Sequence, residues 1–186
     1  MIELPNYYTV ECALGGHPDK ICDQICDSIL DQYLFYDKDA KVAIECLGTE
    51  SYLVIGGEVF SNTTIDVENI ANKVFHQIGY SEDLTILNKI KNQPLQLRKA
   101  VQMGASGDQG IMYGFACNNI HSNFLPAGVF LINSVAKEID LLRNETNLYL
   151  PDGKIQMTFD QNKIETLLIN IQHFENSNLN YLKNFI

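Results

Sequence analysis

The stretch from residue 19 to residue 35 constrains the fold most, because its apolar and acidic side chains alternate with helical spacing. On one face stand the apolar residues Ile21, Ile25, Ile29 and Leu30. Aspartates occupy much of the opposite face, and Pro18 and Asp19 are typical start signals of a helix. This stretch therefore predicts an amphipathic helix, which needs an apolar surface to pack against.

Two strand-like runs follow this helix, at residues 41–47 and 52–60, and the short Gly-Thr-Glu-Ser between them predicts a hairpin. Asp66 then opens a second helix that runs to about Gly79. Its apolar stripe comprises Val67, Ile70, Val74 and Ile78. The order helix, strand, strand, helix favours an α+β layer in which helices cover one face of a sheet.

The second half of the chain is interpreted in the same way, although no sequence repeat is evident. Residues 91–107 contain Pro and Gly with few large apolar groups, so they predict a mobile loop. The following residues predict a strand at 111–116, a helix from Pro126 to about Arg143, a hairpin of strands 155–159 and 164–171, and a short helix in the tail.

Composition excludes several classes of partner. The 186 residues are 46% hydrophobic, enough for the core of one domain or of two small ones. The formal charge of −10 would repel nucleic acid and anionic membranes, and also a nucleotide triphosphate unless cations are supplied locally. No apolar run is long enough to cross a bilayer, and the first residues lack a secretory signal, so we expect a cytoplasmic protein.

The five cysteines argue against covalent or metal crosslinks. Their number is odd and no Cys-x-x-Cys pair occurs, which disfavours a disulfide framework and a structural zinc site. Cys22 and Cys26 fall four residues apart on the predicted helix, where small buried hydrophobic side chains are the favoured interpretation.

The segment His17-Pro18-Asp19-Lys20 is the first candidate site. At the start of a helix, free N–H groups attract anions. A histidine, a carboxylate able to hold Mg²⁺ and a lysine meet at this point, and phosphate chemistry uses all three. Taken alone, the same residues are equally an ordinary helix start on the surface.

Three further segments carry acidic residues next to glycine or proline. Residues 104–110 hold Asp108 among glycines, residues 151–154 read Pro-Asp-Gly-Lys, and residues 56–58 read Gly-Gly-Glu. Glycine lets a backbone approach a ligand closely, and Asp108 is then able to accept from a ribose hydroxyl or an amine. Singly, each is also a plain turn or a strand bulge.

Their joint order is what identifies a family. The segments 16–20, 56–58, 107–110 and 151–154 together resemble the signatures of methionine adenosyltransferases, also called S-adenosylmethionine synthetases, over the N-terminal half. The resemblance implies an α+β fold of similar β-sheet units, with helices on the outer face and flat sheets packing between subunits. Residues 1–186 would form the first unit or two and part of another, with an internal boundary near 91–107 or 120–126.

The resemblance also implies a reaction and its residues. Members of the family join methionine to ATP, use Mg²⁺ and K⁺, and release phosphate and pyrophosphate from a site between two subunits. Catalysis would fall to His17, beside the C5′ oxygen, and to Lys154. ATP binding would involve His17, Lys20, Asp108, Asp152 and Lys154, methionine binding Glu58 and Gln96, Mg²⁺ binding Asp19, and K⁺ binding Glu45.

Two departures from the family pattern concern the entrance to the site. Gly15 stands where the family usually has glutamate, and the loop before Asp108 looks shorter than usual. The family glutamine of that loop falls near Lys99 in a simple alignment, with Gln96 and Gln102 as the other candidates.

The largest departure is the missing second half, with its cationic residues. ATP carries roughly four negative charges, and its leaving group needs several fixed cations. The chain offers Lys20 and Lys154, with Arg98 or Lys99 from the loop. We therefore expect a catalytic subunit that acts in a hetero-oligomer with a second polypeptide. The alternatives are a non-catalytic regulatory subunit of a synthetase and a functionless relic.

Overall fold

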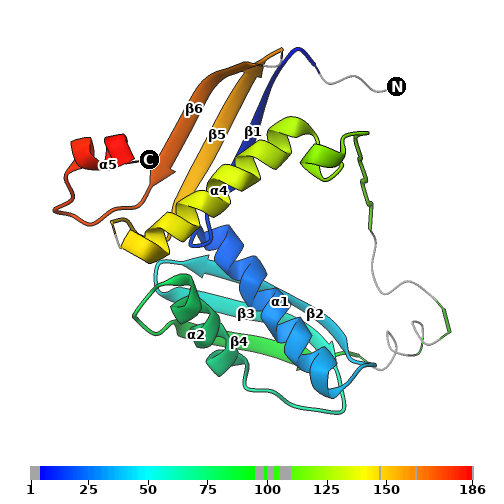
Figure 1. The fold of residues 1–186 in the computed structure, drawn as a ribbon. Coiled ribbons are helices and arrows are strands. Elements are labelled where there is room, and N and C mark those ends of the chain that lie inside the picture. The colour runs from blue at the N-terminus through cyan, green and yellow to red at the C-terminus, as the bar shows by residue number, and fades with distance from the viewer. Residues whose placement is uncertain are drawn as a thin grey trace. The chain divides into compact units, whose positions relative to one another are not determined.

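The computed structural model describes residues 5–94, 99, 103–104, 110–146, 148–161 and 163–185. The chain divides into two compact units: unit 1 contains residues 1–20 and 115–186, and unit 2 contains residues 21–114. Each unit has a three-stranded sheet with helices on one face, so the expected α+β class is confirmed (Figure 1).

Unit 2 is built from one continuous stretch of chain. Its elements are α1 (Pro18–Tyr36), whose first turn lies in unit 1, β2 (Lys41–Thr49), β3 (Tyr52–Phe60), α2 (Val67–Ile78) and β4 (Thr85–Asn92). The sheet order is β2-β3-β4. β2 and β3 form the predicted antiparallel hairpin, whereas β4 lies parallel to β3.

The helices of unit 2 begin and end where the sequence indicates. Asp66 caps α2 by accepting a hydrogen bond from Asn69 N at 3.0 Å, and Gly79 ends it with φ 122°. Of the predicted apolar face of α1, the three isoleucines are buried and Leu30 is half-buried. Ile25 and Ile29 are fully enclosed in the core that includes Ile55 of β3. The amphipathic pattern therefore positions both helices on the sheet.

Asp37 joins two loops of unit 2. Its Oδ2 accepts hydrogen bonds from Asn62 N at 2.7 Å and from Ser61 Oγ at 2.8 Å, and its Oδ1 accepts from Asp39 N at 3.1 Å. The bond from Asn62, followed by that from Ser61, lowers the pKa of the Asp37 carboxyl. The ionised form therefore stabilises the folded state.

We expect Asp37→Asn to weaken the dependence of the free energy of unfolding on pH in the acidic range. A carboxyl whose folded pKa is depressed stabilises the fold above its unfolded pKa of 3.8, and this contribution is lost as pH falls through the folded pKa. Urea unfolding between pH 2.5 and 6 should show a less stable variant at pH 6 and a shrinking difference toward pH 2.5. The control is Asp39→Asn, which removes the same charge two residues away. If Asp37→Asn left the pH dependence of the free energy of unfolding unchanged, the depressed pKa of Asp37 would be contradicted.

Unit 1 is assembled from two distant parts of the chain. Its elements are β1 (Tyr7–Ala13), the short 3-10 turn Ile120–Ser122, α4 (Ala127–Thr146), β5 (Gly153–Asp160), β6 (Lys163–Ile171) and α5 (Leu179–Phe185). The sheet order is β1-β5-β6, with both pairs antiparallel. Ile132 and Ile139 of α4 pack with Ile155 and Met157 of β5 in its core.

The sequence-based expectations fail at three places. β1 and β4 were not anticipated, and β4 takes residues 91 and 92 out of the predicted loop 91–107. The predicted strand 111–116 is wrong: these residues form no strand, and Ile111, Met112 and Tyr113 are at least 80% exposed. A strand needs a partner for its backbone groups, and this segment has none within the described parts of the chain.

Three of the five cysteines lie beside the core of unit 2. All five are free, and Cys22, Cys26 and Cys46 pack against the core of unit 2. Burial raises the pKa of the Cys26 and Cys46 thiols, which favours the protonated, unreactive form. Among the described helices, none is both long and apolar enough to cross a membrane.

Candidate active site

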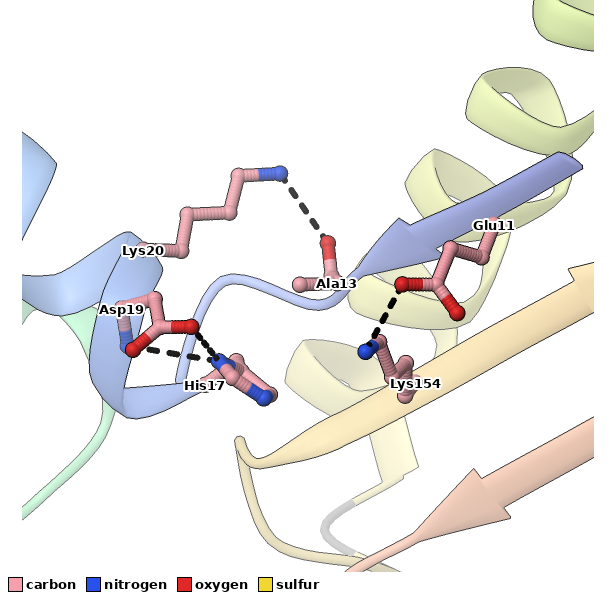
Figure 2. Close-up of polar contacts among 6 residues, drawn as sticks. All are labelled: Glu11, Ala13, His17, Asp19, Lys20 and Lys154. Carbon is pink, nitrogen blue, oxygen red and sulfur yellow. Dashed lines mark hydrogen bonds and ion pairs between the residues drawn. The ribbon is translucent and has the colours of Figure 1, made fainter.

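Two of the candidate motifs meet in unit 1. The loop from β1 to α1 runs along residues 151–154, where Gly16 N donates to Pro151 O at 3.1 Å and Leu14 N donates to Gly153 O at 2.9 Å. Gly16 is buried, and a Cβ atom there would lie 2.7 Å from the carbonyl oxygen of Pro151. Only glycine permits this close approach, which fixes His17 relative to Lys154 (Figure 2).

His17 is held at the start of α1 by contacts of its Nδ1 atom with Asp19. The backbone N–H of Asp19 donates to its Nδ1 at 3.3 Å, and an Asp19 carboxylate oxygen lies 3.9 Å from the same nitrogen. An ion pair would require a proton on Nδ1, but the shorter hydrogen bond requires a lone pair there, and the second distance is at the limit for an ion pair. We therefore assign the ring proton to Nε2, which leaves that N–H free to donate to a ligand.

Asp19 and Lys20 occupy the first turn of α1. The Asp19 side chain is 93% exposed, and the Lys20 ammonium donates to Ala13 O at 3.1 Å. Mg²⁺ in phosphate sites is held by one or two carboxylates, substrate phosphates and water, and not by a protein cage. A single open carboxylate at a helix N-terminus fits such a substrate-borne ion.

Lys154 pairs with a residue that the sequence did not single out. Its Nζ lies 2.8 Å from Oε1 of Glu11, because β1 and β5 pair with Ala13 opposite Lys154 (Figure 2). The hydrogen bond and charge of Glu11, with a smaller effect of Asp19, raise the pKa of Lys154. The lysine is thus kept charged. The alternating exposure of β1 is the signal that points Glu11 outward.

Asp152 belongs to the second motif, residues 151–154, in the same unit. It is half-buried, and its backbone oxygen accepts from Gln172 N at 2.9 Å, which anchors residues 151–154 to the segment after β6. The structure therefore brings together five of the sequence-predicted residues, His17, Asp19, Lys20, Asp152 and Lys154, and adds Glu11.

Glu45 and Glu58 belong to unit 2. They lie on the face of its sheet away from the helices, with Glu45 opposite Gly56 and Glu58 opposite Ala43. Gly57 between them has φ 131°, and a Cβ there would lie 2.9 Å from the Cα of Ile44, so a side chain is excluded. Glu45 is exposed, and its carboxylate is able to provide one oxygen ligand to a K⁺ ion.

Two predicted site residues, Asp108 and Gln96, lie outside the described residues, as does Gln102. In the described ranges, no group of three His, Cys, Asp or Glu residues is arranged to hold a metal.

Comparison with known proteins identifies the class of protein. The histidine, the exposed carboxylate and the two lysines lie around the start of α1, as the order of the motifs predicts. The family model of the N-terminal domain of S-adenosylmethionine synthetase matches residues 6–100, and that of the central domain matches residues 102–186. The chain belongs to the S-adenosylmethionine synthetase family.

Individual relatives carry the same name. The S-adenosylmethionine synthase of Mycoplasma capricolum subsp. capricolum is 37% identical, over 96% of this chain and 51% of the relative. That of Borrelia garinii subsp. bavariensis is 39% identical, over 90% of this chain and 48% of the relative. That of Treponema denticola is 33% identical, over 96% and 52%. The chain thus spans about half the length of the curated relatives it matches.

Proposed function

We propose that this chain is the catalytic subunit of a split S-adenosylmethionine synthase, which forms S-adenosylmethionine from ATP and methionine together with a second polypeptide. The observation that carries the proposal is the contact of residues 15–20 with residues 151–154 in unit 1. A regulatory subunit would have no need of an oriented histidine beside a charged lysine. The family membership supports the same reaction.

In this reaction the methionine sulfur forms a bond to C5′ of the ribose, while the C5′–O bond breaks and its electron pair stays on the tripolyphosphate. The sulfur becomes a sulfonium, and negative charge grows on the departing oxygen. The Nε2–H of His17 is the group able to donate a hydrogen bond to that oxygen. Lys154 and Lys20 would face the phosphates, and Asp152 the nucleoside.

Acidic residues would hold the two metal ions. Mg²⁺, held by Asp19, would neutralise phosphate charge when bound, and K⁺ would be held by Glu45. The methionine ammonium would be held by Glu58, with Gln96 as the candidate in the loop. Asp108 would contact the ribose or its surroundings. In the proposed arrangement Glu45, Glu58 and Asp108 face a substrate that is bound mainly to a neighbouring subunit.

The small number of positive charges near the candidate site supports the need for a second polypeptide. Lys20 already donates to Ala13 O and Lys154 already pairs with Glu11, in a chain whose formal charge is −10. Two such lysines are too few for a leaving group with roughly four charges. The missing cations would come from the part of the family's length that this chain does not span.

The test is to purify this chain alone and to assay S-adenosylmethionine formation from ATP and methionine with Mg²⁺ and K⁺. We expect no turnover above the enzyme-free blank. Adding the half of the Mycoplasma capricolum synthase that this chain does not match, expressed as a separate chain, should restore turnover. The full-length relative is the positive control, and efficient turnover by the isolated chain would refute the dependence on a partner.

Glu11 provides a prediction on binding. The Glu11 carboxylate lies 2.8 Å from the Lys154 ammonium. A polyphosphate that binds this ammonium must therefore displace the carboxylate. Glu11→Gln should tighten binding of Mg²⁺-tripolyphosphate to the chain by up to about fivefold, the scale of an exposed ion pair. Isothermal titration calorimetry measures this change.

The control for Glu11 is Glu138→Gln, which removes the same charge from the exposed side of α4. It should change the affinity by less than about twofold, since the charge of an exposed side chain is screened by salt. Weaker binding by Glu11→Gln would mean that the carboxylate supports the anion site and does not compete with it.

A further inference from the structure

Two neighbouring glycines form the turn that leads into the candidate site. His17 N donates to Leu14 O at 3.1 Å, so Gly15 and Gly16 are the central residues of this turn. Gly16 has to be glycine, because a Cβ atom there would collide with Pro151. Gly15 is not among the described glycines with positive φ, so the backbone at this position accepts a side chain. The reason for glycine at position 15 therefore lies in its surroundings.

A carboxylate of helix α4 lies against Gly15. A Cβ atom on Gly15 would be 3.6 Å from Oδ2 and 3.9 Å from Oδ1 of Asp140. Both distances are close to the reach of a glutamate side chain from its own Cβ atom to its carboxylate oxygens. Asp140 thus holds its oxygens at the distance where a glutamate at position 15, the residue usual in the family, would hold them.

The same carboxylate faces a buried arginine one turn further along α4. Oδ1 of Asp140 lies 4.0 Å from Nε of Arg143, and the arginine side chain is 14% exposed. Within the described parts of the chain, this buried Nε has no hydrogen-bond partner. A buried guanidinium costs free energy unless an opposite charge lies near it. Asp140 therefore compensates Arg143 on one side and lies against the turn before His17 on the other.

Tyr149 places this charge pair beside the core of unit 1. Its side chain is buried, and its Oη donates to Ile139 O at 2.7 Å. Burial raises the pKa of Tyr149, the charge of Asp140 raises it further, and the charge of Arg143 lowers it. Both charges thus act on a buried group of the unit, where water screens them little.

We propose that Asp140 is a positioning residue for the candidate site: from α4, its carboxylate takes the place of the side chain that Gly15 lacks, and so ties the turn before His17 to Arg143. The role in catalysis rests on the proposed function, whereas the link between α4 and the turn does not. The carboxylate should then be transferable, so that a glutamate at position 15 compensates for the loss of Asp140.

The test is a cycle of single and double substitutions at the two positions. Asp140→Ala leaves Arg143 without its carboxylate and should lower the unfolding temperature of the chain by about 4 °C or more. Gly15→Glu places a second carboxylate beside Asp140 and should also lower it, since like charges repel. The double variant keeps one carboxylate, now carried by the turn, and should regain at least about half of the Asp140→Ala loss.

A second readout follows His17 itself by heteronuclear NMR of its ring. The contact of Nδ1 with Asp19 N keeps the ring proton on Nε2, so the two ring nitrogens differ in chemical shift. This difference should shrink in Asp140→Ala, where the turn loosens, and should return in the double variant. The control, Glu138→Ala, removes a carboxylate from the exposed side of α4 and should leave the shifts unchanged. If Asp140→Ala did not fold, Asp140→Asn, which keeps the shape of the side chain, takes its place.

Additive effects of the two substitutions, with no recovery in the double variant, would overturn the inference. Unchanged ring nitrogens of His17 in a folded Asp140→Ala variant would do the same.

The kinetics separate this inference from the proposed function. In the two-chain enzyme, Asp140→Ala should lower kcat about tenfold with little change in the KM for ATP, and the double variant should restore it. An unchanged kcat in an active enzyme would refute the positioning role and keep the split enzyme. Recovery in the cycle, without formation of S-adenosylmethionine by the unaltered two-chain enzyme, would keep the link between α4 and the turn and refute the proposed activity.

Discussion

Gly16→Ala is expected to destabilise unit 1 by about 2 kcal/mol or more, the scale of overpacking in a closely packed site. The added methyl group would lie 2.7 Å from the carbonyl oxygen of Pro151 and closer still to its side chain. Since backbone and a rigid ring cannot move aside cheaply, the loop must separate from residues 151–154. For a unit of this size the unfolding temperature should fall by about 10 °C.

The neighbouring glycine provides a matched control. A Cβ atom on Gly15 would meet only the Asp140 carboxylate, with its nearest oxygen at 3.6 Å, an ordinary contact. Gly15→Ala should therefore change stability by less than about 0.5 kcal/mol. Thermal unfolding followed by near-ultraviolet circular dichroism, with hydrogen exchange to resolve the two units, measures both variants. Equal stabilities would contradict the close contact of the two motifs.

His17→Ala in the assembled two-chain enzyme is expected to lower kcat by about 10² to 10³, the scale for loss of one donor to a developing anion. KM for ATP should change little, because the Nε2–H is assigned to charge that grows during bond breaking. Replacement by alanine leaves the Gly16–Pro151 contact in place, so the loop should keep its course. Steady-state kinetics with both substrates measures the effect.

His121→Ala is the control for this variant, because His121 is an exposed histidine of unit 1 outside the candidate site. Its kcat should stay within about twofold of the unaltered enzyme. If His17→Ala were equally active, the chain would fit the rival role of a regulatory subunit that retains the motifs without using them. A large loss confined to KM would instead assign His17 to binding.

The elements that the sequence predicted well are those with strong local signals. Asp66 and Gly79 mark the ends of α2, and the spacing of Ile21, Ile25 and Ile29 defines the buried face of α1. β4 was missed because Asn88, Lys89 and Lys91 interrupt its pattern and only Ile86 and Ile90 turn inward. Residues 111–116 show the opposite error, a predicted strand that does not form. High β propensity produces no strand unless a neighbouring strand pairs with it.

The sequence selected residues for the candidate site but did not indicate the contacts between them. The order of four short motifs was enough to select His17, Asp19, Lys20 and Lys154. The approach of Gly16 to Pro151 depends on β1 pairing with β5, a long-range contact that no local pattern encodes. Glu11 was missed for the same reason, because its importance arises only from lying beside Lys154.

The inserted position of unit 2 has a consequence for biosynthesis. Ile21–Gly114 is continuous, so it is able to fold on the ribosome as soon as it emerges. β1, however, is translated first, and its backbone groups must wait for β5, which is translated only after all of unit 2. Such delayed pairing slows folding and leaves an early strand exposed to wrong partners. Until then, the unpaired backbone groups of the strand that carries Glu11 are exposed in the nascent chain.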